Sequence, residues 1–361
     1  MPLKLEPRAQ PSRIMQYGSP LLAIALTAAM GMVFFIAMGK DPVAAFYAFT
    51  VLPVADLYGF GELLIKASPL ILIALGLAIG FRANVWNIGA EGQLTVGAIF
   101  SGAVALRYGP DGGVWVLPAM IVAGAIGGAA WAAVPAFLRT RFNASEILVS
   151  LMLTYVAQLW LSYLVYGPWR DPKGYNFPQS EPLAESALFP VLLDGTRLNA
   201  SILITLAAVA VAWIILSRSF VGYQLKVTGL SEAAARYAGF SARRAVWIGM
   251  LAGGITAGVA GVGEVAGPLG QLFPTASPGY GFAAIIVAFL GRLNPIGIVL
   301  AGLLMSLLYL SGEAAQMALN LPSATTGVFQ GMLLFFLLGA DVLINYRIRA
   351  VLGTAPRRAV A

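Results

Sequence analysis

The chain has 361 residues, of which 59% are hydrophobic and only 10% carry a charged side chain. This composition excludes an ordinary soluble globular domain and predicts a polytopic membrane protein with helical spans. The sequence has no cysteine and no histidine, which excludes disulfides, thiol chemistry, the usual zinc sites and a histidine base. The net charge of +7 favours a basic cytoplasmic rim facing anionic membrane lipid over nucleic-acid binding, which needs a soluble basic patch.

About ten apolar segments approach the roughly 20 residues that a membrane-crossing helix needs. The predicted spans are 19–39, 64–81, 92–106, 115–137, 146–166, 199–217, 246–266, 281–291, 295–312 and 326–344. Segments 92–106 and 281–291 are shorter than a full crossing, so we expect them to be tilted, broken or re-entrant. The predicted fold is all-α, with a transmembrane domain over 19–346 between cytoplasmic tails at 1–18 and 347–361.

The orientation of the spans follows from Lys and Arg, which are retained on the cytoplasmic side of short loops. With both termini inside, about 16 of the 22 basic residues lie on the cytoplasmic side. The remaining ones are Lys40, Lys66, Arg107, Arg170, Lys173 and Arg197. In this orientation the Pro-rich loop 167–198 is external, where it either receives a partner or packs as an irregular cap on helix ends.

A polar, charged interval at 218–245 separates two strongly apolar spans. Ser231 is a plausible N-cap, good helix formers follow it, and Gly239 suits the position just past a helix end. The interval therefore predicts a short cytosolic helix that buries little surface and docks against a partner outside the membrane. The predicted docking residues are Ser231, Glu232, Ala233, Ala234, Ala235, Arg236, Tyr237, Ala238 and Gly239.

A second segment, 81–93, places polar and glycine residues in an otherwise apolar region. Its polar side chains must face protein, water or a ligand, while its glycines permit a broken helix. We predict that the segment lines a substrate path; the alternative is a cytoplasmic turn whose side chains cap helix ends. The candidate path residues are Asn84, Trp86, Asn87, Glu91 and Gln93.

The run 253–263 is rich in glycine, which favours close helix packing over a sliding gate. Glu264 follows this run and Glu313 lies near the outer end of another span. Each is either a functional group or an interfacial one, because an ionisable group at membrane depth is costly.

The phosphate-binding motif GxxxxGK[ST] is missing from the sequence. Any ATP that the system uses is therefore expected to bind another subunit.

Two segments together resemble a known family. They are NVWNIGAEGQLTVGA and GLSEAAARYAGFSARRAVWIGMLAGGITAGVAGVGEVAGPLG. Both resemble the membrane permease subunits of bacterial ATP-binding-cassette (ABC) importers, in the branch that serves simple sugars, branched-chain amino acids and nucleosides, and most of all the nucleoside-type permeases. The resemblance covers roughly residues 60–345. Ser231 stands where asparagine is expected, which leaves the helix-capping role intact.

The resemblance implies a transport subunit of the bacterial inner membrane without a cofactor or covalent chemistry of its own. Residues 231–240 would be the coupling helix, seated in a cleft of a cytosolic ATPase that binds ATP. Closure of the ATPase would switch the permease between inward-open and outward-open states. A second permease chain, identical or homologous, would complete the path, and an external lipoprotein would deliver the substrate, a nucleoside or alternatively a monosaccharide.

Two other classes are less favoured. A stand-alone secondary transporter or channel is expected to carry more acids inside the membrane for ion coupling. A membrane enzyme would need clustered acids or a histidine. An ATPase gene next to this one would separate the importer from both alternatives.

Overall fold

The computed structural model describes residues 3–8, 10, 12–322 and 324–350. The chain forms two compact units, one over Pro53–Leu310 and the other over Met1–Leu52 with Ser311–Ala361. Eight helices among the described residues are long and apolar enough to cross a membrane, and shorter apolar helices accompany them. This composition of elements confirms the predicted all-α, polytopic membrane fold.

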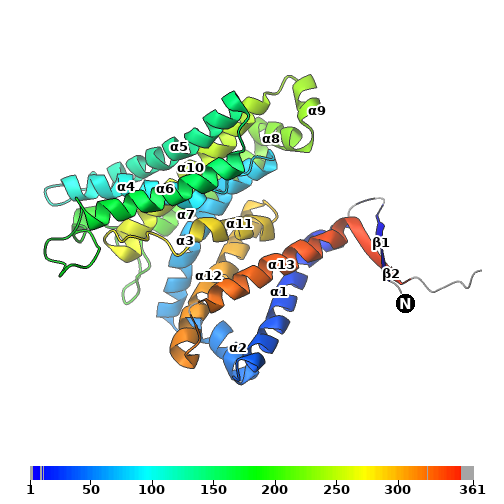
Figure 1. Cartoon of the computed structure of the whole chain (residues 1–361), viewed down its shortest axis with the longest axis horizontal. Helices are drawn as coiled ribbons and strands as arrows, with labels where there is room; N and C mark the ends of the chain where they lie inside the picture. Colours follow the sequence, from blue (N-terminus) through cyan, green and yellow to red (C-terminus); the bar gives the residue numbers. More distant parts are fainter. Residues whose placement is uncertain (1–2, 9, 11, 323, 351–361) are drawn as a thin grey trace, which may run out of the picture. The chain divides into compact units, whose positions relative to one another are not determined.

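The larger unit is built around two buried helices (Figure 1). Its helices are α3 (Leu57–Arg82), α4 (Ala90–Tyr108), α5 (Val116–Phe142), α6 (Glu146–Tyr166), α7 (Ser201–Arg218), α8 (Phe220–Leu230), α9 (Glu232–Tyr237), α10 (Ala242–Glu264), α11 (Tyr280–Leu290) and the first part of α12 (Pro295–Leu319). Short helical turns lie at η1 (Leu52–Val54), η2 (Glu185–Ala187) and η3 (Val265–Leu269). Helices α3 and α10 are the most buried of the candidate spans, and α10 packs against α3, α4 and α5.

The smaller unit contains α1 (Arg13–Ala37), α2 (Pro42–Thr50), the end of α12, α13 (Thr325–Asn345), and the strands β1 (Leu3–Pro7) and β2 (Tyr346–Ala350). Helix α1 packs against α13, and Phe49 stacks on Phe329 with ring centroids 4.3 Å apart. Strands β1 and β2 pair antiparallel, where the sequence predicts only tails. The pairing brings the N- and C-terminal segments together; the side of the membrane on which they lie stays a prediction.

Glycines allow α10 to approach its neighbours closely. A Cβ atom added to Gly258 would lie 2.1 Å from the carbonyl oxygen of Gly124 on α5. One added to Gly97 on α4 would lie 2.4 Å from Gly258 Cα. No side chain fits at such distances, so the backbones are in direct contact. Close packing, the favoured interpretation of this glycine run, is confirmed.

Helix α10 changes geometry immediately after Glu264. Residues Val265–Leu269 form a π-helical turn in which Gly267 leaves helical geometry (φ −109°, ψ −107°). Gly270 then adopts the left-handed conformation (φ 65°) that glycine tolerates best. A break of this kind exposes backbone groups at membrane depth, which is tolerated where the break is covered by protein or lines a cavity.

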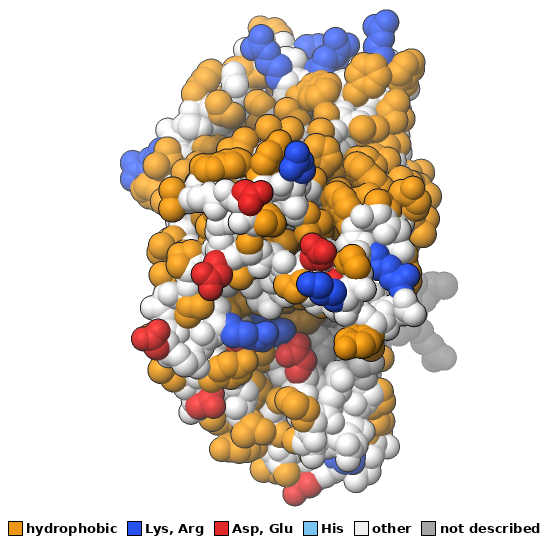
Figure 2. All heavy atoms as spheres, turned by 90° about the vertical axis from the view of Figure 1, so that its left-hand side faces the viewer, with side chains coloured by type: hydrophobic (Ala, Val, Ile, Leu, Met, Phe, Trp, Pro, Cys, Tyr) orange, Lys and Arg blue, Asp and Glu red, His pale blue; other side chains and the backbone are white. Residues whose placement is uncertain are grey.

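The loop 167–198 covers this break. Phe189 N donates a hydrogen bond to Ala266 O at 2.8 Å, and Leu183 N donates to Gly270 O at 2.8 Å. The loop thus packs as a cap on a helix end, the second of its two predicted roles. Within the larger unit, the loop and the α8–α9 segment lie at opposite ends (Figure 1). Figure 2 shows Lys and Arg side chains gathered at the upper edge of the face in view, with acidic and basic side chains interspersed below them.

Candidate functional site

A cavity of about 310 Å³ lies where the N-terminal part of α3 meets the broken end of α10. Segment 275–278 and Tyr280, the first residue of α11, complete its wall. Four charged side chains line it: Glu62, Lys66, Arg197 and Glu264. Ligand pockets in proteins typically measure about 300–1,000 Å³, so the cavity is large enough for a small polar molecule.

The first pair of charged groups is locked together. Arg197 Nε donates to Glu62 Oε1 at 2.8 Å and Nη2 donates to Oε2 at 2.5 Å, a two-pronged contact. These hydrogen bonds raise the pKa of Arg197 above its ordinary value, so the guanidinium stays charged. Because Glu62 lies on α3 and Arg197 lies in the loop 167–198, the ion pair fixes one wall of the cavity.

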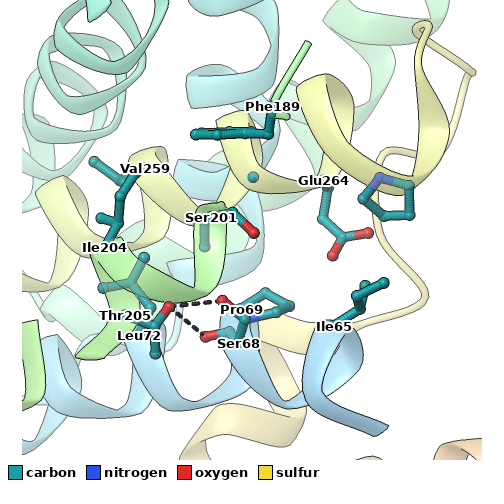
Figure 3. A pocket seen from close by; sticks show the side chains of 13 residues that line it. Ile65, Ser68, Pro69, Leu72, Phe189, Ser201, Ile204, Thr205, Val259 and Glu264 are labelled. Carbon is teal, nitrogen blue, oxygen red and sulfur yellow. Dashed lines mark hydrogen bonds between the residues drawn. The ribbon is translucent and has the colours of Figure 1, made fainter. Parts of the chain in front are cut away.

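Glu264 is placed differently. Its side chain is only 6% exposed, and Figure 3 shows its carboxylate pointing toward the helix that carries Ile65 and Pro69. The carboxylate faces both the large cavity and an adjoining narrow pocket of about 10 Å³. In that pocket Ser68 Oγ and Thr205 Oγ1 are 2.6 Å apart and satisfy each other. Among the described residues, no protein group donates a hydrogen bond to Glu264.

Glu264 is a candidate from the sequence alone, but the other charged residues of the cavity are not. Lys66 and Arg197 were assigned to the outer surface, and Glu62 was not singled out. The sequence does contain one signal for this cluster: Glu62 lies one helical turn before Lys66, at the start of a predicted span. Only the fold shows that Arg197, far along the chain, completes the group.

The predicted path residues form a compact network elsewhere. Asn87 Nδ2 donates to Gln93 Oε1 at 2.8 Å, and Gln93 Nε2 returns a hydrogen bond to Asn87 Oδ1 at 2.9 Å. Asn87 Oδ1 also accepts from Gly89 N at 3.2 Å, in the turn that precedes α4. Both amides are almost fully buried. Each therefore has its polar groups satisfied by the protein itself.

Glu91 is bonded to the start of α11. Its Oε2 accepts from Gly281 N at 2.7 Å. Ser277 Oγ in turn accepts from Tyr280 N at 2.9 Å. Glu91 and Ser277 thus cap a helix N-terminus whose first N–H groups have no partner inside the helix.

The other two predicted path residues complete the turn. Asn84 adopts the left-handed conformation (φ 56°) and accepts a hydrogen bond from Trp86 Nε1 at 2.9 Å. Trp86 stacks on Phe289 with ring centroids 5.5 Å apart. None of the five candidate path residues lines the 310 Å³ cavity. Their contacts agree with the capping alternative, and a role in the substrate path stays a prediction.

The same turn is tied to the segment predicted to dock a partner. Arg82 Nη1 donates to Leu216 O on α7 and Nη2 donates to Leu293 O after α11, both at 2.8 Å. A Cβ atom added to Gly229 on α8 would lie 2.1 Å from Arg82 O. Helix α8 therefore rests on the backbone of the turn between α3 and α4.

The docking segment has the predicted local structure. Ser231 Oγ accepts from Ala234 N at 3.2 Å as the N-cap of α9, and Gly239 has a positive φ of 79° just past its end. The predicted docking residues are exposed except Ala235, which is fully buried. Tyr237 is 97% exposed, an unusual position for an aromatic ring in an isolated protein.

The docking segment is held on the larger unit by aromatic packing. Phe240, which follows α9, contacts Phe220 and Tyr223 of α8 edge-to-face, with ring centroids 5.8 and 6.1 Å apart. Arg236 and Glu232 form an exposed ion pair at 3.1 Å along α9. An exposed pair of this kind adds little stability, so the aromatic contacts carry more of the anchoring.

Comparison with known proteins identifies relatives of the whole chain. Residues 59–338 match the family model described as a branched-chain amino acid transport system, permease component. A glucose ABC transporter permease protein of Haloferax volcanii is 35% identical over 96% of this chain and 93% of its own length. A guanosine ABC transporter permease protein of Bacillus subtilis is 30% identical over 94% of this chain and 96% of its own. A nucleoside ABC transporter permease protein of Lactococcus lactis is 28% identical over 88% of this chain and 89% of its own.

Proposed function

This chain belongs to the permease family of branched-chain amino acid transport systems, and from that premise we propose that it forms the translocation path of an ABC importer for nucleosides. The chain is a multi-pass permease subunit of the cytoplasmic membrane, in a family branch whose members include nucleoside and sugar ABC permeases. A transport subunit of this type moves its substrate without covalent chemistry.

The proposal rests on the family match together with two features of the larger unit. A charged cavity lies at one end of this unit, and the exposed helix α9 lies at the other. The cavity at the end of α10 would hold the substrate as it enters from outside. Helix α9 would receive a separate cytosolic ATPase, because its exposed alanines and Tyr237 present a surface that a partner can cover. ATP is bound by that partner in this proposal.

Arg82 and Gly229 give a route between the two ends. Displacement of α8 and α9 by the ATPase would press on the turn before α4, and Arg82 connects that turn to α7 and to the end of α11. Helix α11 begins at the cavity, and its start is bonded to Glu91. Movement of these packed elements as a unit would open the path alternately to either side. A second permease chain and an external binding lipoprotein complete the system that we propose.

Nucleosides are proposed as the substrate because the sequence resembles the nucleoside branch. Two of the relatives are also described as permeases for guanosine and for nucleosides. A monosaccharide is the second candidate, and the 35% identical glucose permease favours it. Both substrates are neutral and rich in hydroxyl groups, so the balanced charges of the cavity suit either.

The proposal is tested by ATP-driven uptake into proteoliposomes that contain the permease with its neighbouring ATPase and binding-protein gene products. Radiolabelled uridine, guanosine and D-glucose are offered separately, with and without ATP. ATP-dependent uptake of a nucleoside supports the proposal. ATP-dependent uptake of glucose alone assigns the sugar function, and uptake that is independent of ATP contradicts the importer class.

A further inference from the structure

Glu264 is the one cavity acid for which the described part of the chain supplies no hydrogen-bond donor. Glu62, the other acid that lines the cavity, is bound by Arg197 through two hydrogen bonds, and Glu91, which does not line it, is bound by Gly281 N. Glu264 is 6% exposed, and it lines both the 310 Å³ cavity and the adjoining narrow pocket that Figure 3 shows. A carboxylate at the wall of a cavity accepts hydrogen bonds from a donor that enters the cavity. A hydrogen-bond donor for Glu264 therefore comes from the cavity and not from the described part of the chain.

The charges around Glu264 restrict what that donor is. Lys66, Arg197 and Glu62 line the same cavity as Glu264. A metal cation or an organic cation in the cavity would meet Lys66 and Arg197, and an anion would meet Glu62 and Glu264 itself. A neutral molecule with hydroxyl groups is repelled neither by the basic nor by the acidic side chains of the cavity. Its hydroxyls can donate directly to the carboxylate.

We propose that Glu264 binds the vicinal diol of the transported molecule, each carboxylate oxygen accepting a hydrogen bond from one of two adjacent hydroxyls. The proposal rests on the transport function proposed above and names the group that the permease recognises. A carboxylate has two coplanar oxygens, which suits a pair of neighbouring hydroxyls on a ribose or hexose ring. Ile65 and Pro268, which also line the cavity, offer apolar surface to the ring carbons.

The test uses two probes that differ only in the diol, uridine and 2′,3′-dideoxyuridine, with D-glucose as a third. Binding is measured by saturation-transfer NMR titration of the purified permease–ATPase complex in nanodiscs, without the external binding protein, so that only the permease selects. Wild type is compared with Glu264→Gln. The matched control is Glu146→Gln, an acid that pairs with Arg139 and does not line the cavity.

We expect Glu264→Gln to weaken uridine binding by about tenfold or more, because a hydrogen bond to a charged acceptor contributes on that scale. The affinity for dideoxyuridine should be low in the wild type and unchanged in the variant. Glu146→Gln should leave the ratio between the two probes as it is. The diol assignment would be overturned if Glu264→Gln weakened the binding of uridine and dideoxyuridine equally or left uridine binding unchanged. It would also be overturned if the wild type bound none of the probes.

The outcomes separate this inference from the proposed function. Glucose binding that depends on Glu264, with no uridine binding, keeps the diol assignment and refutes the nucleoside substrate. ATP-driven uridine uptake that is the same in wild type and Glu264→Gln refutes the diol assignment and keeps the nucleoside importer.

Discussion

At the scale of single residues, the structure separates acids that serve the fold from one that faces open space. Glu91 is 2% exposed and bonded to Gly281 N, whereas Glu264, which is 6% exposed, faces the cavity. Hydropathy treats the two alike, because each is a carboxylate in an apolar stretch. The difference is that Glu91 lies next to the backbone N–H groups at the start of α11, whereas Glu264 does not.

Glu91 provides the first prediction. Glu91→Ala should lower the free energy of unfolding by about 1–3 kcal/mol, because Gly281 N–H would be left buried without an acceptor. Glu91→Gln retains an amide oxygen as acceptor and should destabilise less, with near-normal uptake per folded transporter. Thermal unfolding and uptake of the purified, reconstituted variants measure the two quantities. A stable Glu91→Gln variant with greatly reduced uptake would favour the path role predicted from the sequence.

At the scale of elements, close contact between α10 and its neighbours depends on glycine. Gly258 faces the Gly124 carbonyl, while a Cβ atom on Gly263 would have Ser201 Cβ, at 3.7 Å, as its nearest neighbour. Both glycines belong to the same glycine-rich run, so a sequence pattern does not distinguish them. Their different surroundings follow from which face of α10 meets α5.

Gly258→Val should therefore prevent correct packing and strongly reduce the yield of folded permease, since overpacking of this kind costs about 1–3 kcal/mol or more. Gly263→Ala should be tolerated, because its methyl group would make an ordinary contact. Size-exclusion profiles and membrane yields of the two variants provide the comparison. Similar yields for both would show that α10 does not pack as described.

The coupling role of α9 gives the third prediction. Ala234→Arg adds a large charged side chain to the exposed face of α9 and should uncouple ATP hydrolysis from uptake while the permease still folds. Val114→Arg is the control, since it adds the same charge at a 94% exposed position between α4 and α5. Hydrolysis and uptake are measured on the same preparation. Normal copurification with the ATPase and normal substrate-stimulated hydrolysis in Ala234→Arg would contradict the assignment.

At the scale of the whole molecule, the fourth prediction concerns topology. The distribution of basic residues places both termini and α9 in the cytoplasm and the loop around Lys173 outside. Reporter fusions at the C-terminus and next to Tyr237 should give cytoplasmic signals, and a fusion at Lys173 should give an external one. Identical signals at the C-terminus and Lys173 would overturn the predicted number of spans.

The sequence by itself determined the membrane class, the approximate positions of most spans and the capped helix at Ser231, because apolar length and helix caps are local properties of the chain. It also indicated the glycine packing of α10. The charged cavity was decided only by the tertiary structure. Glu62 and Arg197 are 135 positions apart in the chain, and the acceptor role of Glu91 depends on a helix that begins at Tyr280. Hydrogen bonds between distant segments have no local signature, so the chain had to fold before Glu91 and Glu264 could be distinguished.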